Sequence, residues 1–200
     1  KQGIGEWCHP LHTVDINDAG LRSSVQNGIL NTELGIPFRT PAEGHNVAFT
    51  SLWDNYPDSL EIPLKGKASR AYLLMAGSTN HMQCHIDNGV IRIYYKDGTR
   101  DVMFLRNPDN WPPIEHIFFE DGLAFNRHTP ALYRLRLKTG EISNNFGEEL
   151  GFPGASRELD GGAAVLLEMP LNPGKKLSHL VLETLSNDVV IGLMGITLQR

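Results

Sequence analysis

Glycine and proline interrupt this chain so often that it has little room for helices. The sequence has 200 residues, and its 20 glycines and 12 prolines are spread along the whole length. Glycine weakens a helix because it loses much conformational freedom on folding, and proline breaks one because it lacks a backbone N–H. Short segments rich in β-branched and aromatic residues lie between these breaks, a pattern typical of strands joined by turns. We therefore expect an all-β fold of about ten strands, with at most one short helical turn within residues 15–29.

The clearest element is a hairpin at residues 90–105. Side chains alternate along Val90–Tyr95, and Asp101–Leu105 follows as the partner strand. Asp97-Gly98 lies between them, and this pair favours a tight hairpin turn because the turn needs positive φ. The same reasoning predicts seven more strands, at Ala48–Leu52, Leu60–Leu64, Arg70–Met75, Ala131–Lys138, Ala164–Met169, Leu177–Thr184 and Val189–Leu198.

Length and composition indicate one soluble domain, residues 1–200, and the strand pattern predicts that it folds as a β-sandwich. Hydrophobic residues make up 40% and charged residues 20%, which is ordinary for a globular protein. The net charge of −5 has the wrong sign for general nucleic-acid binding. No apolar run approaches the roughly 20 residues that span a bilayer, so we expect no membrane span.

Two further regions suggest where loops and solvent lie. Arg134, Arg136 and Lys138 alternate along one short stretch, which a solvated strand face explains best. Residues Asn107–Glu115 and Ser143–Gly162 are rich in turn-forming residues and are predicted to be long loops. Long ordered loops on a β scaffold are where binding sites usually lie.

The sequence contains no nucleophile-elbow, phosphate-loop or dinucleotide-binding motif, which speaks against an enzyme. Two weaker enzyme hypotheses stay open. One is a metal-dependent enzyme with ligands from His81, His85, Glu115 and His116. The other is a glycoside hydrolase with a carboxylate pair drawn from Asp54, Asp58, Glu148 and Glu149.

Aromatic and polar residues gather at two places that predict sugar binding. A protein binds a sugar by stacking an aromatic ring on its C–H face and hydrogen-bonding its hydroxyls. The two clusters supply the predicted ligand-binding residues Trp53, Asp54, Asn55, Tyr56, Asn110, Trp111 and Glu115. The competing interpretation is that these aromatic rings close the ends of the sandwich.

Metal and disulfide signals are weak. Asp15, Asn17 and Asp18 offer the hard oxygens that Ca²⁺ prefers, but a turn or a helix cap explains them more simply. We therefore predict no metal ligands and no cofactor, with calcium as a weak alternative. Cys8 and Cys84 could pair in an oxidising compartment, although two buried thiols are the simpler interpretation.

A segment from Thr40 to Glu115 carries a resemblance to a known family. It contains Trp53-Asp54-Asn55-Tyr56-Pro57, then Ile62-Pro63-Leu64, Lys67-Ala68, Ala71–Thr79, Tyr95-Lys96-Asp97-Gly98 and finally Asn107-Pro108 with Trp111 and Glu115. This order is similar to galactose-binding-like β-sandwich domains of bacterial glycoside hydrolases and polysaccharide-utilisation proteins. The segment Leu180–Leu198 also resembles the closing strands of that fold.

The resemblance implies a jelly-roll of two antiparallel sheets, a Gram-negative periplasmic, cell-surface or secreted setting, and a role near glycan degradation. We therefore expect a non-catalytic, carbohydrate-associated module that binds a glycan weakly or docks onto a catalytic domain of the same chain. The alternatives are a glycoside hydrolase, or part of one, and a purely structural β-sandwich spacer without a ligand.

Overall fold

The computed structural model describes residues 15–80, 83–115, 127–145 and 159–200, and these are almost entirely β-structure. Their elements are α1 (Ala19–Ser23), β1 (Val25–Gln26), β2 (Ile29–Asn31), β3 (Pro37–Arg39), β4 (Ala48–Ser51), β5 (Ser59–Pro63), β6 (Arg70–Thr79), β7 (Asp87–Tyr95), β8 (Arg100–Arg106), β9 (Arg134–Arg136), β10 (Ile142–Ser143), β11 (Ala163–Pro170), β12 (Leu177–Thr184) and β13 (Val189–Gln199).

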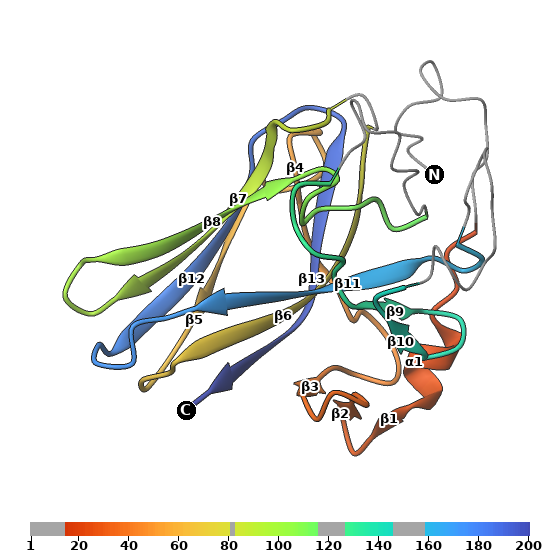
Figure 1. Ribbon diagram of the computed structural model, residues 1–200, viewed down its shortest axis with the longest axis horizontal. Coiled ribbons are helices and arrows are strands. Elements are labelled where there is room, and N and C mark those ends of the chain that lie inside the picture. The colour runs from red at the N-terminus through yellow and green to blue at the C-terminus, as the bar shows by residue number, and fades with distance from the viewer. Residues whose placement is uncertain (1–14, 81–82, 116–126, 146–158) are drawn as a thin grey trace.

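The strands form three antiparallel sheets. A six-stranded sheet has the order β10-β9-β11-β6-β13-β4, and a four-stranded sheet has the order β5-β12-β7-β8. The third sheet, β1-β2-β3, is small and lies beside α1, at the lower right of Figure 1. Strand pairing in all three is antiparallel, as expected for an all-β sandwich.

The two larger sheets enclose the main hydrophobic core. Leu73 and Met75 of β6 lie in one cluster with Ile91 and Ile93 of β7, and all four side chains are fully buried. Side chains alternate between the faces of a strand, so these residues point from each sheet towards the other. The protein therefore has the face-to-face packing of a β-sandwich.

A second core lies on the other face of the six-stranded sheet. Leu74 and Ala76, which alternate with the first set along β6, pack in a cluster with Leu21 of α1 and Phe38 of β3. Phe38 fits closely over β13, because a side-chain carbon at Gly195 would lie 3.1 Å from its ring. Thus α1 and the small sheet cover a sheet face that would otherwise expose apolar residues.

The predicted hairpin is confirmed, with β7 and β8 paired around Asp97-Gly98 and Gly98 at a φ of 83°. The other predicted strands also form, although β6 extends further and β9 is shorter than expected. The predicted helical turn corresponds to α1. The sequence interpretation missed the small sheet, although Asn27-Gly28 marks its first hairpin with the same signal, at φ values of 52° and 74°.

One sequence interpretation is wrong. Arg134 does not lie on a solvated face but is 8% exposed, and its guanidinium donates to the carbonyls of Pro113 (2.8 Å) and Ala163 (3.1 Å). Arg134 therefore ties the 107–115 loop to β11. Of the other two basic residues, Arg136 is half-buried and Lys138 is exposed.

Within the described ranges, no helix has the length and apolar character required to cross a bilayer.

The turn of the β7–β8 hairpin should show a defined pH dependence. Hydrogen bonds from Thr99, with a smaller contribution from Lys175, lower the pKa of Asp97 from 3.8 to about 2. A carboxyl group with a lowered folded-state pKa stabilises the protein above its unfolded-state pKa, and this contribution disappears as the pH falls towards 2. Asp97→Asn should therefore lower the melting temperature at pH 7 and have a smaller effect at pH 3.

Thermal unfolding followed by circular dichroism at both pH values measures this difference. Glu43→Gln, which removes another exposed carboxylate, is the control. An Asp97→Asn effect of equal size at pH 7 and pH 3 would contradict the prediction.

Candidate functional site

The first predicted cluster forms an aromatic surface beside β4. Trp53 and Tyr56 are half-buried, with ring centroids 6.3 Å apart, and Phe49 meets Tyr56 edge-on at 6.3 Å. Phe49 is 41% exposed, while Asp54 and Asn55 are exposed within the same loop. The structure therefore brings four predicted residues together with one that the prediction omitted.

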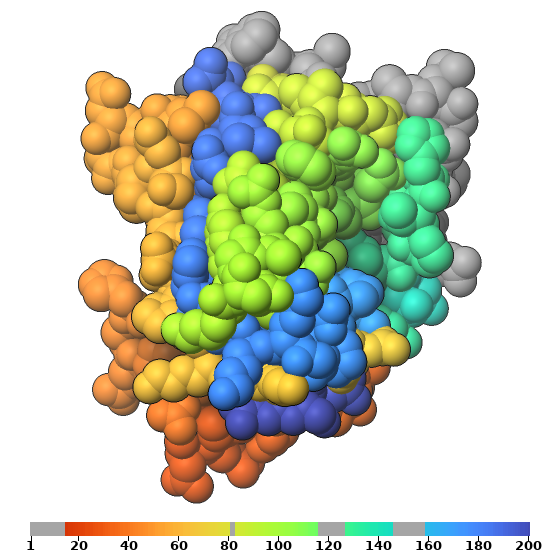
Figure 2. Space-filling model, turned by 90° about the vertical axis from the view of Figure 1, so that its left-hand side faces the viewer, coloured from red at the N-terminus to blue at the C-terminus, as the bar shows by residue number. Residues whose placement is uncertain are grey.

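Hydrogen bonds hold the loop that carries this aromatic surface. The Ser51 N–H donates to the Pro57 carbonyl at 3.0 Å and closes the loop, and the Tyr56 N–H donates to the Trp53 carbonyl at 3.0 Å. The Ser51 hydroxyl donates to the Val189 carbonyl of β13 at 2.8 Å. The orange segment that contains β4 and this loop projects at the upper left of Figure 2.

The second predicted cluster has a different character, because Trp111 is fully buried. Its ring belongs to the main core and packs against Gly77 of β6, where a side-chain carbon would lie 2.7 Å from the indole. Trp111 thus adopts the structural alternative that the sequence left open, and it offers no ring face to a sugar.

Asn110 and Glu115 are also engaged by the protein. The Asn110 amide accepts a hydrogen bond from the Arg106 N–H at 2.7 Å and donates to the Phe104 carbonyl at 2.9 Å, which fixes the turn after β8. The Glu115 carboxylate accepts a hydrogen bond from the Ser78 hydroxyl at 3.3 Å. Burial raises the pKa of Glu115, while hydrogen bonds from its own backbone and from Ser78 and the charge of Arg134 oppose the shift.

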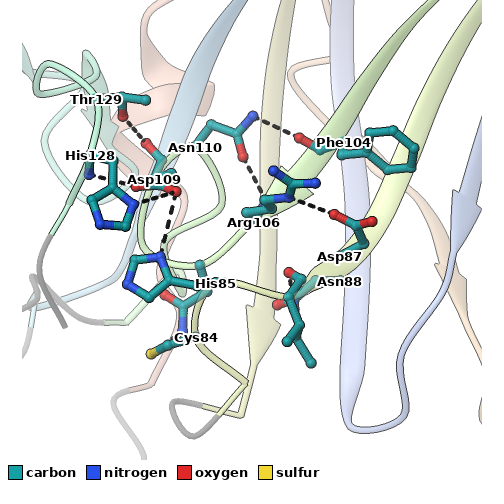
Figure 3. A network of polar contacts seen from close by, with 12 residues as sticks. Cys84, His85, Asp87, Asn88, Phe104, Arg106, Asp109, Asn110, His128 and Thr129 are labelled. Atoms are coloured by element: carbon teal, nitrogen blue, oxygen red, sulfur yellow. Dashed lines mark hydrogen bonds and ion pairs between the residues drawn. The ribbon is translucent and has the colours of Figure 1, made fainter. Parts of the chain in front are cut away.

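The 107–115 loop also contributes to a group of side chains that the sequence analysis missed. His85 precedes β7, Asp109 follows β8 and His128 precedes β9, and one ligand atom from each lies within 4.8 Å of the others. Figure 3 shows both imidazole rings directed towards the Asp109 carboxylate. We call these three residues the histidine–aspartate cluster.

Hydrogen bonds position each member of the histidine–aspartate cluster. The Asp109 Oδ1 atom accepts a hydrogen bond from the backbone N–H of His128 at 2.7 Å. The Thr129 hydroxyl donates to the Asp109 carbonyl at 2.7 Å (Figure 3). The His85 N–H donates to the Asn107 carbonyl at 2.7 Å. The buried Asn88 side chain donates to two carbonyls of the turn that carries His85.

The structure brings only one member of the predicted histidine group into this cluster. His85 lies in the cluster, but Glu115 bonds Ser78 elsewhere, and His81 and His116 fall outside the described residues. Sequence spacing could not have found Asp109 and His128, because the three residues come from segments far apart in the chain. The structure also shows that the backbone at His85 turns with a positive φ of 56°.

The remaining candidates have ordinary structural contacts or lie outside the described residues. The Asp18 carboxylate accepts hydrogen bonds from the side chains of Arg22 (2.8 Å) and Asn46 (3.0 Å), and it makes no capping bond to the backbone of α1. Asn17 caps the Ala19 N–H at 3.0 Å. Cys8, Glu148 and Glu149 lie outside the described residues. Cys84 is half-buried, and the Asn107 amide donates to its sulfur at 3.6 Å.

No protein-family model matches this chain, and neither the curated proteins nor the solved structures contain a significant match.

The two tryptophans should differ sharply in their contribution to stability. Trp111→Ala removes a fully buried ring from the main core, so it should reduce the free energy of unfolding by about 3–5 kcal/mol. Trp53→Ala changes a half-buried surface ring and should cost about 1 kcal/mol or less. Urea denaturation followed by tryptophan fluorescence and circular dichroism measures both values. Equal losses would show that the two rings are buried to the same extent in solution.

Proposed function

We propose that this protein is a non-catalytic carbohydrate-associated module that binds a glycan at the Phe49–Trp53–Tyr56 surface. The observation that carries the proposal is the combination of accessible aromatic rings with the exposed polar side chains of Asp54 and Asn55. Rings of this kind stack on the C–H face of a sugar, and the neighbouring carboxylate and amide can bond its hydroxyl groups.

Two features support this assignment. The loop is closed by main-chain hydrogen bonds, so its rings are already positioned and binding orders few groups. The sequence resemblance to galactose-binding-like domains of glycoside hydrolases gives the same class of ligand, and it adds the jelly-roll topology and the periplasmic or secreted location to the proposal.

Docking onto a catalytic domain is a second use of the same surface. Phe49 is 41% exposed and Leu52 is 37% exposed beside the half-buried rings, so the patch has apolar area that a protein partner could cover. The exposed Asp54 and Asn55 side chains favour a sugar, because hydroxyl groups can satisfy them in the bound state.

Affinity electrophoresis through gels containing galactan, galactomannan, xylan or β-glucan tests the proposal. We expect at least one polysaccharide to retard the wild-type chain. Trp53→Ala and Tyr56→Ala should each weaken this binding about 5-fold, since a stacked ring contributes on the order of 1 kcal/mol.

Tyr133→Ala is the matched control. Tyr133 is 40% exposed and precedes β9, near the edge of the six-stranded sheet opposite to β4. Retardation that is equal in the wild type and in Trp53→Ala would exclude this surface as the glycan site. Absence of retardation in every gel would contradict glycan binding by the isolated chain.

A further inference from the structure

The geometry points to a metal site in the histidine–aspartate cluster: His85, Asp109 and His128 bind one Zn²⁺ or a similar divalent transition-metal ion. This site is separate from the aromatic surface and does not depend on the function proposed for it. It rests on the distances between the ligand atoms, their surroundings and the chemistry of the side chains.

The ligand atoms have the spacing that a shared ion requires. The Asp109 Oδ2 atom lies 3.6 Å from His85 Nδ1 and 3.7 Å from His128 Nδ1. These distances exceed the roughly 2.7–3.2 Å that is typical of an N–H···O hydrogen bond. Two ligands of a tetrahedral Zn²⁺ ion lie about 3.3 Å apart, because each is about 2.0–2.1 Å from the metal. The two Asp109–histidine distances exceed this value by only a few tenths of an ångström, and all three ligand atoms lie within 4.8 Å of one another.

The imidazole of His85 has unsatisfied hydrogen-bonding capacity within the described part of the chain. Both of its ring nitrogens are buried from solvent, and neither has a hydrogen-bond partner among the residues that the structure describes. A buried polar atom without a partner is costly, so such an atom calls for an explanation. A metal ion between His85 and Asp109 would satisfy the nitrogen that faces the carboxylate.

The side chains select the class of metal. Two imidazoles and one carboxylate suit borderline transition-metal ions such as Zn²⁺, whereas Ca²⁺ and Mg²⁺ prefer sites made of oxygen ligands. Three protein ligands leave a fourth position for water or for another ligand. His128 is 65% exposed, so that position can be reached from solvent.

The charges around the cluster are compatible with a bound cation. Asp109 supplies one negative charge, and Arg106, a cationic side chain that feels this charge, is already paired with Asp87 at 2.6 Å (Figure 3). The hydrogen bond that Arg106 donates to Asp87 is the largest of the effects that raise the pKa of Arg106, and the charge of Asp109 adds a smaller one. The Arg106 charge is therefore largely matched by Asp87.

Hydrogen bonds also prepare the carboxylate for this role. The backbone N–H of His128 donates to Asp109 Oδ1, so the other carboxylate oxygen, Oδ2, faces both imidazoles. A hydrogen bond to a metal-binding side chain holds that side chain in orientation and raises the affinity of the site for the metal. An ion at this position would join three segments that are distant in the sequence, and it should stabilise the folded chain in proportion to its binding.

Calorimetric titration of the full 200-residue chain with ZnCl₂, after removal of metal by a chelator and dialysis, tests the proposal. We expect one Zn²⁺ site, an increase in melting temperature with Zn²⁺, and tetrahedral absorption bands when Co²⁺ replaces Zn²⁺. His128→Ala, Asp109→Asn and His85→Asn should each weaken this site by at least about 100-fold, because each removes a ligand. Asparagine is chosen at His85 because it tolerates the positive φ of 56°.

Two histidine variants outside the cluster serve as controls. His45→Ala removes an exposed imidazole, and His179→Ala removes one that lies 4.0 Å from Glu61. Both should leave the titration unchanged. His128 is exposed, so His128→Ala should keep the wild-type circular dichroism spectrum even if a change at a more buried position perturbs folding. No Zn²⁺ binding by the wild type, or full binding by folded His128→Ala, would overturn the proposal.

Discussion

The burial of both faces of β6 is the constraint on which the rest of this structure depends. Leu73 and Met75 point into the core shared with the four-stranded sheet, while Leu74 and Ala76 point into the core beneath α1 and β3. Either face left open would expose a broad apolar surface to water, at about 25 cal/mol for each Å². Burial of the six-stranded sheet therefore requires both the four-stranded sheet on one face and α1 with the small β1-β2-β3 sheet on the other.

This arrangement sets the character of the loops. Trp111 fits against Gly77 of β6, and Arg134 hydrogen-bonds the carbonyl of Pro113, so much of the 107–115 loop is fixed to the core. The loop consequently offers a buried ring and a fixed carboxylate, not a sugar platform. The same loop places Asp109 opposite His85, with 3.6 Å between Asp109 Oδ2 and His85 Nδ1.

The two proposed sites differ in their physical basis. The aromatic surface beside β4 depends on accessible rings, and its specificity would come from Asp54 and Asn55. The histidine–aspartate cluster depends on three ligand atoms held within 4.8 Å by hydrogen bonds in separate loops. Their separate residues allow glycan binding and metal binding to be tested independently.

The sequence by itself determined the local elements. Asp97-Gly98 predicted the central hairpin, and Asn27-Gly28 carried the same signal for the small sheet, because both turns require positive φ that few residues adopt. Alternation and turn residues also located most of the longer strands. The sequence could not show which tryptophan is buried, since Trp53 and Trp111 have similar neighbours along the chain. Tertiary structure decided that Trp111 enters the core, that Arg134 leaves solvent, and that His85, Asp109 and His128 meet. The reason is that turn geometry depends on adjacent residues, whereas burial and ligand convergence depend on how distant segments pack.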